Sequence, residues 1–405
     1  MTLREYTANF KTMLRVPLEV SPRLVWKILY NFAWRNLKNM RQFEKRQAKG
    51  EPFFPAFVMI SVTESCNLAC SGCWVSVGGK KSLSKAQLDG IITESKKKGS
   101  FFFGILGGEP LLYKGLFDIM EKHADCYFQL FTNGMLITDE VAMRMKKLGN
   151  ITPLISIEGL KEESEKRRGG DEVYNKTLNG VRACKKAKLM FGAAASICKG
   201  NYNDLVNREY IELLAKEGVH YLWYYIYRPV GANPDPDNAL SEDQILELRK
   251  FIVKQRLDAP LFLIDTYWDA KGNALCPAAT GMSHHISPSG AVEFCPPLQM
   301  ATDYINEDGS NLQELFEESK FLADLRTMTA DGSRGCILLE NPNKLAEFSE
   351  QYHAQDSSSR QTVLQEYRNM TPVAGHDQNG REIPEENVFY KIMKKKYFFG
   401  FGAYG

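Results

Sequence analysis

The chain reads FVMISV at residues 57–62 and CNLACSGCW at residues 66–74. A short, continuous apolar run is typical of a buried strand. The three cysteines that follow it, Cys66, Cys70 and Cys73, lie within eight residues, so their thiols can reach one compact metal centre. Soft sulfur ligands favour iron–sulfur clusters, zinc or copper(I). A four-iron cluster held by three cysteines keeps one iron open, and an open position is typical of a reactive metal site.

Two simpler interpretations of this loop are a structural zinc knuckle and a chance cluster of buried thiols. A structural zinc site usually has a fourth Cys or His ligand nearby. All six histidines lie far from the loop in sequence, which favours a cluster over zinc.

Outward from the loop, apolar runs alternate with amphipathic segments. Ser84 with Gln87 and Ser241 with Gln244 form predicted capping boxes, and Thr138 precedes two acidic residues at another helix start. The predicted strands are 57–62, 101–106, 126–131, 151–157, 189–197 and 219–227, and the helical patterns between them lie near 84–98, 114–123, 138–147, 172–188 and 203–217. This alternation predicts a parallel sheet, either open and doubly wound or closed into a barrel, with ligands at the carboxyl ends of its strands.

Four motifs at the ends of these strands resemble those of the radical S-adenosylmethionine (SAM) superfamily. One is the Cys-x3-Cys-x2-Cys spacing followed by an aromatic residue, here Trp74. The others are Gly107-Gly108-Glu109-Pro110, Thr132-Asn133-Gly134 and Ser156-Ile157-Glu158-Gly159, the last with Glu where the family commonly has Asp. The resemblance covers roughly residues 57–231.

The resemblance implies a partial (β/α)6 barrel that holds a [4Fe-4S] cluster on Cys66, Cys70 and Cys73, with SAM on its open iron. One electron would cleave SAM to methionine and a 5′-deoxyadenosyl radical that abstracts hydrogen from a substrate. Within the barrel, Glu109 would hold the methionine amino group and Val230 would lie near the adenine. The residues implied in SAM binding are Trp74, Gly107, Gly108, Glu109, Pro110, Asn133, Ser156, Glu158, Arg168, Ser196, Val230 and Gly231.

A second set of cysteines follows the predicted barrel. Cys276, Cys295 and Cys336, with Gly290 between the first two, resemble the opening of SPASM and twitch domains, which hold auxiliary iron–sulfur clusters. The Cys-x2-Cys pair of a full SPASM domain is absent, so the resemblance implies a twitch-like domain with one auxiliary [4Fe-4S] cluster. Unrelated buried thiols are the alternative. His284 and His285 are candidate fourth ligands, although adjacent loop histidines usually face solvent. Structural core thiols are expected at Cys126, Cys184 and Cys198.

The expected organisation is therefore α/β with four parts. Residues 1–50 form a basic amphipathic helical leader, and residues 51–258 form the partial barrel. Residues 259–340 form a small SPASM/twitch-like auxiliary-cluster domain. Residues 341–405 are a helical or irregular extension with a basic, aromatic tail.

Composition narrows the function classes. A net charge of +2 argues against a dedicated nucleic-acid binder. No secretory signal or membrane-spanning stretch is evident, and nine cysteines without an export signal are better explained as thiols or metal ligands than as disulfides. These features predict a cytoplasmic protein.

The leader suggests an attachment at the inner face of a membrane. Basic amphipathic helices with aromatic residues can lie in the membrane interface. The leader could equally pack across the open barrel, because an apolar helical stripe usually faces a core.

The substrate is expected to be lipid-like or another apolar metabolite, with a peptide or a sugar as alternatives. A flavodoxin or ferredoxin would supply electrons. A non-catalytic iron–sulfur protein for electron transfer or sensing is the alternative of another class, but it would need no SAM pocket. The sequence identifies no catalytic acid or base.

Overall fold

The computed structural model describes residues 12–76, 78–332 and 335–396. Its sheet contains β1 (Phe57–Ser61), β2 (Phe102–Leu106), β3 (Tyr127–Thr132), β4 (Ile151–Ser156), β5 (Gly192–Ile197), β6 (Tyr221–Ile226), β7 (Phe262–Asp265), β8 (Ser283–Ile286) and β9 (Val292–Glu293). A separate two-stranded sheet pairs β10 (Met300–Ala301) with β11 (Gln355–Asp356).

A helix at residues 12–19 precedes the leader segments α2 (Pro22–Lys27), η1 (Ile28–Trp34) and α3 (Arg35–Ala48). Helices among the sheet strands are α4 (Lys85–Lys97), α5 (Leu116–Lys122), α6 (Asp139–Leu148), α7 (Lys161–Arg168), α8 (Val173–Lys186), α9 (Tyr202–Leu205), α10 (Arg208–Lys216) and α11 (Glu242–Gln255), with short 3-10 turns η2 (Pro110–Leu112) and η3 (Pro236–Asn238). Later helices are α12 (Leu312–Glu318), α13 (Lys320–Gly332), α14 (Ile337–Glu340), α15 (Pro342–Gln351), α16 (Val363–Asn369) and α17 (Val388–Lys396).

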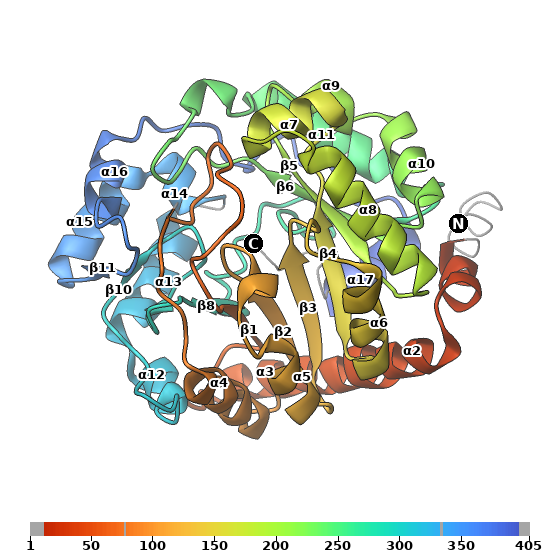
Figure 1. The fold of residues 1–405 in the computed structure, drawn as a ribbon. Helices are drawn as coiled ribbons and strands as arrows, with labels where there is room; N and C mark the ends of the chain where they lie inside the picture. Colours follow the sequence, from red (N-terminus) through yellow and green to blue (C-terminus); the bar gives the residue numbers. More distant parts are fainter. Residues whose placement is uncertain (1–11, 77, 333–334, 397–405) are drawn as a thin grey trace.

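The expected α/β fold is confirmed. All six predicted strands are present, and β1 to β6 follow one another in order as parallel neighbours. The helix starts agree as well: Ser84 and Ser241 form complete capping boxes, and Thr138 caps α6. Figure 1 shows the strands fanned across the molecule, with connecting helices along the outer side of the sheet.

The sheet extends beyond the six predicted strands at both edges. β7 pairs in parallel with β6, and β8 pairs in parallel with β1, bringing Met59 opposite His285. Both added strands come from the segment expected to be a separate auxiliary domain. The boundary at residue 258 remains a prediction, and the strands on either side of it share one sheet.

The leader crosses the amino-terminal end of the strands (Figure 1). Phe32 packs on Phe102 and Tyr127, the Asn39 side chain donates to the Ala56 carbonyl, and Lys27 donates to the Leu148 carbonyl. Its middle turn, η1, is a π-helix, a form that is uncommon and often marks functional sites. Within the described ranges, no helix combines the length and apolar character needed to cross a bilayer.

Candidate active site

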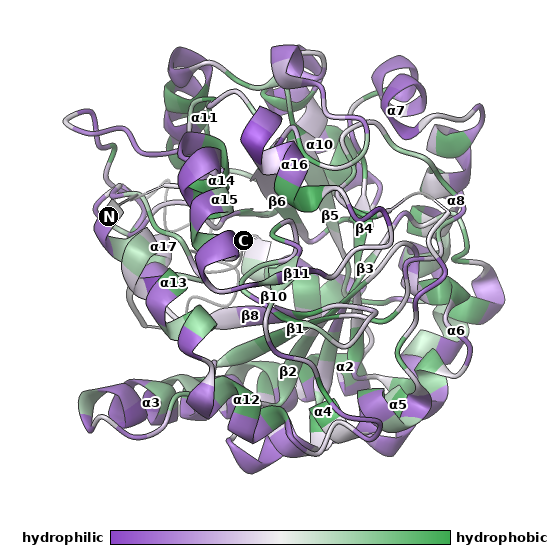
Figure 2. Ribbon diagram, turned by 90° about the vertical axis from the view of Figure 1, so that its left-hand side faces the viewer, coloured by the Kyte–Doolittle hydropathy of each residue, from purple (hydrophilic) through white to green (hydrophobic). Residues whose placement is uncertain are grey.

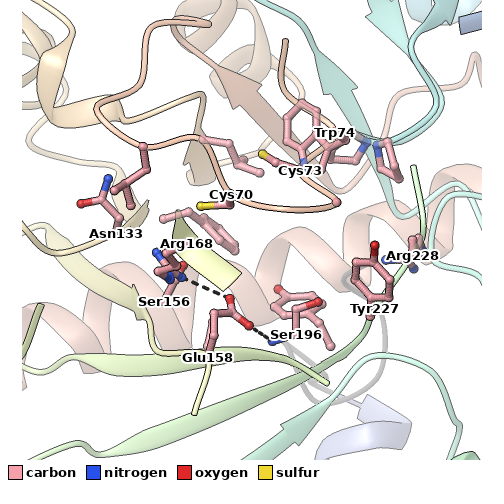
Figure 3. Close-up of a pocket in the computed structure, with 18 of the residues that line it drawn as sticks. Cys70, Cys73, Trp74, Asn133, Ser156, Glu158, Arg168, Ser196, Tyr227 and Arg228 are labelled. Atoms are coloured by element: carbon pink, nitrogen blue, oxygen red, sulfur yellow. Dashed lines mark hydrogen bonds and ion pairs between the residues drawn. The ribbon is translucent and has the colours of Figure 1, made fainter. Parts of the chain in front are cut away.

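The three-cysteine loop follows β1 at the carboxyl ends of the strands, beside a cavity of about 300 Å³. The cavity brings together most of the predicted site residues: Cys66, Cys70, Cys73, Trp74, Gly107, Gly108, Asn133, Ser156, Glu158, Arg168, Ser196 and Val230. Figure 3 shows Cys70 and Cys73 on one side of this cavity, across from Glu158 and Ser196. Residues from five strand ends and one loop therefore share a single space.

Two glycines allow the cysteine loop to sit so close to its neighbours. A Cβ at Gly108 would lie 2.4 Å from the carbonyl oxygens of Glu64 and Ser65, which precede the loop. A Cβ at Gly231, whose φ is +87°, would lie 2.1 Å from the Cys73 carbonyl oxygen. Larger residues at either position would push the loop away from the strand ends.

Glu158 organises the opposite wall of the cavity through two arginines and a backbone amide. Its Oε1 lies 3.1 Å from Arg168, its Oε2 lies 2.9 Å from Arg167, and Oε2 also accepts from the Ser196 amide at 3.0 Å. Arg167 donates in addition to the Ser196 hydroxyl at 3.0 Å and stacks over the Tyr227 ring. Burial opposes the charge of Arg167, but Glu158 beside it raises the pKa of the guanidinium above its ordinary value. The result is a fixed polar wall with cationic groups near the cysteines.

Glu109 lies in the turn that follows β2, outside the lining of the cavity. Its carboxylate is fully buried and accepts from the Leu111 amide at 3.0 Å, the Thr132 hydroxyl at 2.8 Å and the Asn133 amide at 2.8 Å. Burial raises its pKa, while these donors act in the opposite direction. Glu109, Pro110 and Gly231 are the predicted residues that do not line the cavity. In this structure Glu109 ties the GGEP turn to the end of β3.

The loop thiols suit a metal cluster. Burial, reinforced by the neighbouring thiols, raises the pKa of Cys73 to about 12, and burial also raises the pKa of Cys70 and of Cys66. Three crowded thiols in this setting stay protonated unless a strong positive charge stabilises the thiolates. Iron supplies such a charge, and a coordinating thiol is deprotonated.

Arg167, Tyr227 and Arg228 are among the cavity residues that the sequence analysis did not predict. Arg167 precedes the predicted Arg168, and the double arginine at the end of α7 was a usable signal. Tyr227 and Arg228 follow β6 and line the cavity beside Trp74 (Figure 3). Only the aromatic character of the β6 segment hinted at them.

The second cysteine set converges as well. Cys276, Cys295 and Cys336 line one small cavity of about 40 Å³ behind the first. Burial raises the pKa of Cys276 to about 11, with Cys336 adding to the effect, and it raises the pKa of Cys295 well above its ordinary value. Cys126, Cys184 and Cys198, by contrast, are buried and line neither cavity, as expected of core thiols.

Arg228 lies between the two cysteine sets and lines both cavities. Its side chain is partly exposed, and in the described part of the chain no carboxylate forms an ion pair with its guanidinium and its Nε has no hydrogen-bond partner. The Tyr267 ring lies 5.7 Å from it. Although burial opposes its charge, Tyr267 and the thiols of Cys336 and Cys295 raise the pKa of Arg228 above its ordinary value. A cation without a carboxylate partner favours an anion between the two sites.

The expectation that His284 and His285 face solvent is wrong. Both lie in β8, where the pleated backbone buries them against neighbouring elements. His285 joins Glu293 at 2.5 Å and Ser61 at 2.7 Å, whereas His284 lines the second cavity. The two ring nitrogens of His284 are already engaged by the Phe294 carbonyl at 3.0 Å and by Arg326 at 3.1 Å.

Comparison with known proteins supports the same interpretation. The model of the radical SAM superfamily matches residues 60–193. Over 302 residues the chain is 33% identical to the mycofactocin maturase MftC of Mycobacterium tuberculosis, with 69% of this chain and 75% of that one covered. It is 25% identical to the Fe-coproporphyrin III synthase of Methanosarcina barkeri, over 52% of this chain and 56% of that one. The chain thus spans little more than half the length of this synthase.

The fold also has solved counterparts. The SAM-bound crystal structure of SuiB from Streptococcus suis superposes with a TM-score of 0.60 at 17% identity, covering 72% of each chain. A fold of this kind, a matching family model and a relative above 30% identity over most of both chains agree with the cysteine loop at the strand ends. The chain belongs to the radical SAM superfamily and is an enzyme of that family, for which SAM and a [4Fe-4S] cluster are the implied cofactors.

Proposed function

We propose that this enzyme cleaves SAM at a cluster held by Cys66, Cys70 and Cys73 and abstracts hydrogen from a substrate bound between the two cysteine sets. The observation that carries the proposal is the single cavity in which the three thiols face the polar wall built on Glu158. When bound, the cluster and SAM supply one-electron cleavage of SAM to methionine and a 5′-deoxyadenosyl radical, which takes a substrate hydrogen.

The chain's own residues would bind and orient SAM. The cationic pair Arg167 and Arg168 would attract the SAM carboxylate, while Glu158 holds both guanidiniums in place. Ser196, whose hydroxyl accepts from Arg167, would bind the ribose. Trp74, which packs edge-on against His285, would flank the adenine. Glu109 would act through the GGEP backbone by fixing the turn that carries Gly107 and Gly108.

An auxiliary [4Fe-4S] cluster on Cys276, Cys295 and Cys336 is the second part of the proposal. Arg228 supports it, because its guanidinium has no carboxylate partner in the described ranges, and a cluster with three thiolates carries net negative charge and would lie beside it. His284 is a poor fourth ligand because both of its nitrogens are engaged. The fourth position would remain for the substrate or another ligand.

For the substrate, the relatives and the surface favour different classes. MftC is named a maturase and SkfB of Bacillus subtilis a maturation protein, which favours a peptide. The exposed aromatic face of the leader favours a lipid-like substrate and a peripheral position at the inner face of a membrane. A flavodoxin or ferredoxin would deliver electrons.

The test is anaerobic reconstitution with iron and sulfide, reduction by dithionite, addition of SAM and detection of 5′-deoxyadenosine by mass spectrometry. Wild type should produce it, and a Cys66→Ala, Cys70→Ala, Cys73→Ala variant should not. Cys126→Ala, which removes a buried thiol outside both cavities, is the matched control and should behave as wild type. Adding peptides, lipids or sugars should then raise turnover for the correct class. A filled, reducible cluster that neither binds SAM in a titration nor cleaves it would contradict the proposal.

A further inference from the structure

The leader helix carries an exposed aromatic stripe. Trp26, Tyr30 and Trp34 recur every four residues, with exposed fractions of 68%, 46% and 60%, and the rings of Trp26 and Tyr30 stack at 6.4 Å. Leu29 of the same helix is also exposed, at 56%, and so is Leu18 of the preceding helix, at 76%. Scattered exposed apolar residues are ordinary, but a stripe of this size on one element marks an interaction surface.

The helix that carries this stripe also contributes residues to the core. The opposite face of the same leader is buried: Leu24, Ile28, Met40 and Phe43 are each at most 9% exposed. The leader therefore both closes the amino-terminal end of the sheet and presents a second apolar face outward. The two interpretations of its sequence, packing and surface attachment, are compatible in one helix.

A basic groove continues the stripe along the same helix. It begins at Tyr30 and Trp34, has a volume of about 670 Å³, and is bounded by α3 and the carboxyl end of α4. Seven basic side chains and one acidic side chain line it: Arg35, Lys38, Lys45, Arg46, Lys96, Lys97, Lys98 and Glu51. In Figure 2, hydrophilic colouring predominates along α3.

Part of this positive charge has no acidic partner. Asp125 pairs with Lys96 at 2.8 Å and with Arg35 at 3.6 Å. Lys38 and Lys45, in contrast, have no carboxylate within 4 Å in the described part of the chain. The groove thus keeps a net positive charge that an external anion can neutralise.

We infer that this two-part surface docks the enzyme on an anionic bilayer. The aromatic stripe would sit at the headgroup level, where Trp and Tyr are favoured, and the groove would receive lipid phosphates. Each basic residue near an anionic leaflet adds attraction that depends on salt. A nucleic acid would also meet the groove but would leave the apolar stripe beside it exposed. The inference concerns the membrane contact within the proposed function and is independent of SAM cleavage.

The experiment is flotation of the full chain with vesicles of phosphatidylcholine alone or with about one third phosphatidylglycerol. We expect about tenfold more protein to float with the anionic vesicles, and most of that binding to be lost at high salt. Trp26→Ser with Trp34→Ser, and separately Lys38→Glu with Lys45→Glu, should each reduce flotation about tenfold. We choose point variants because deletion of the whole leader would also remove the core residues of its inner face.

Matched controls remove similar residues elsewhere. Met143→Ser with Leu160→Ser removes exposed apolar groups, and Lys254→Glu changes an exposed charge on α11. Both should float as wild type does. Failure of wild type to float, equal binding to neutral vesicles, or equal loss in the controls would overturn the inference. So would a dimer in light scattering that the tryptophan variants dissociate, because the stripe would then be a subunit interface. A negative result here leaves the 5′-deoxyadenosine assay unaffected.

Discussion

The two cysteine sets differ in the segments that supply them and in the size of the cavity that they line. Cys66, Cys70 and Cys73 come from one short loop and open onto a cavity of about 300 Å³. Cys276, Cys295 and Cys336 come from three separated segments and enclose about 40 Å³. The first cavity is therefore large enough to admit a cofactor and part of a substrate, whereas the second has room only for a compact group.

Charge distinguishes the two sites as clearly as size. In the first, Glu158 pairs with both Arg167 and Arg168, so the wall keeps one positive charge in excess, and the Nε of Arg168 has no hydrogen-bond partner. The arginine of the second site is Arg228, which also lines the first cavity and lacks a carboxylate partner in the described ranges. A cation that has no carboxylate partner is stabilised when an anion binds beside it. The two sites therefore differ in whether a carboxylate of this chain partners the lining arginines.

The largest expected effect is the loss of iron when either cysteine set is replaced. Wild type reconstituted anaerobically should hold about eight irons per chain, and replacing either cysteine set by serine should leave about four. Only the first replacement should abolish 5′-deoxyadenosine formation. Iron and sulfide analysis beside the SAM assay measures this. About four irons in wild type, unchanged by serine at Cys276, Cys295 and Cys336, would remove the auxiliary cluster from the proposal.

An intermediate effect is expected at Arg228. Arg228→Met removes the cation beside the second set, so it should lower iron occupancy there and shift the auxiliary midpoint potential downward by on the order of 50 mV, because a nearby positive charge favours the reduced cluster. Arg228→Lys should restore much of both. Redox titration followed by electron paramagnetic resonance measures the shift at each cluster separately. Equal shifts at both clusters would mean that Arg228 does not discriminate between them.

The smallest effect concerns thiol reactivity in metal-free protein. The pKa is raised to about 12 at Cys73 and about 11 at Cys276, so both thiols stay protonated at pH 7 and their thiolate fraction rises about tenfold per pH unit up to pH 10. Iodoacetamide labelling should follow this slope. Exposed Cys66 should react about tenfold faster than Cys276, as measured by peptide mass spectrometry. A rate at Cys276 that is independent of pH would indicate a thiolate already formed at pH 7.

The sequence predicted those parts of the fold and site that local patterns determine. Strand runs, capping boxes at Ser84 and Ser241, and motifs at strand ends need only neighbouring residues, and they agree with the structure. The cavity follows because parallel strands end at one edge. Arg167 could have been predicted with Arg168, since both end the same helix.

Long-range pairing could not be predicted in this way. The short segment around His284 and His285 has no strand periodicity of its own, and its burial results from pairing with β1. Nothing local to Arg228 indicates that it would lie between two cavities. The hydrogen bonds from the amides of Leu111 and Asn133 to Glu109 likewise depend on how the GGEP turn packs against the end of β3.

The pairing of β1 with β8 has a consequence for how the chain is made. Met59 emerges from a ribosome long before its partner His285, by roughly 10 to 50 seconds at ordinary rates of synthesis. During that interval one side of the apolar β1 strand has no partner, and an unpaired strand edge is prone to pair with other chains. Nascent protein should therefore depend on chaperones until β8 is synthesised, and expression at low temperature or with added chaperones should improve the yield of folded enzyme.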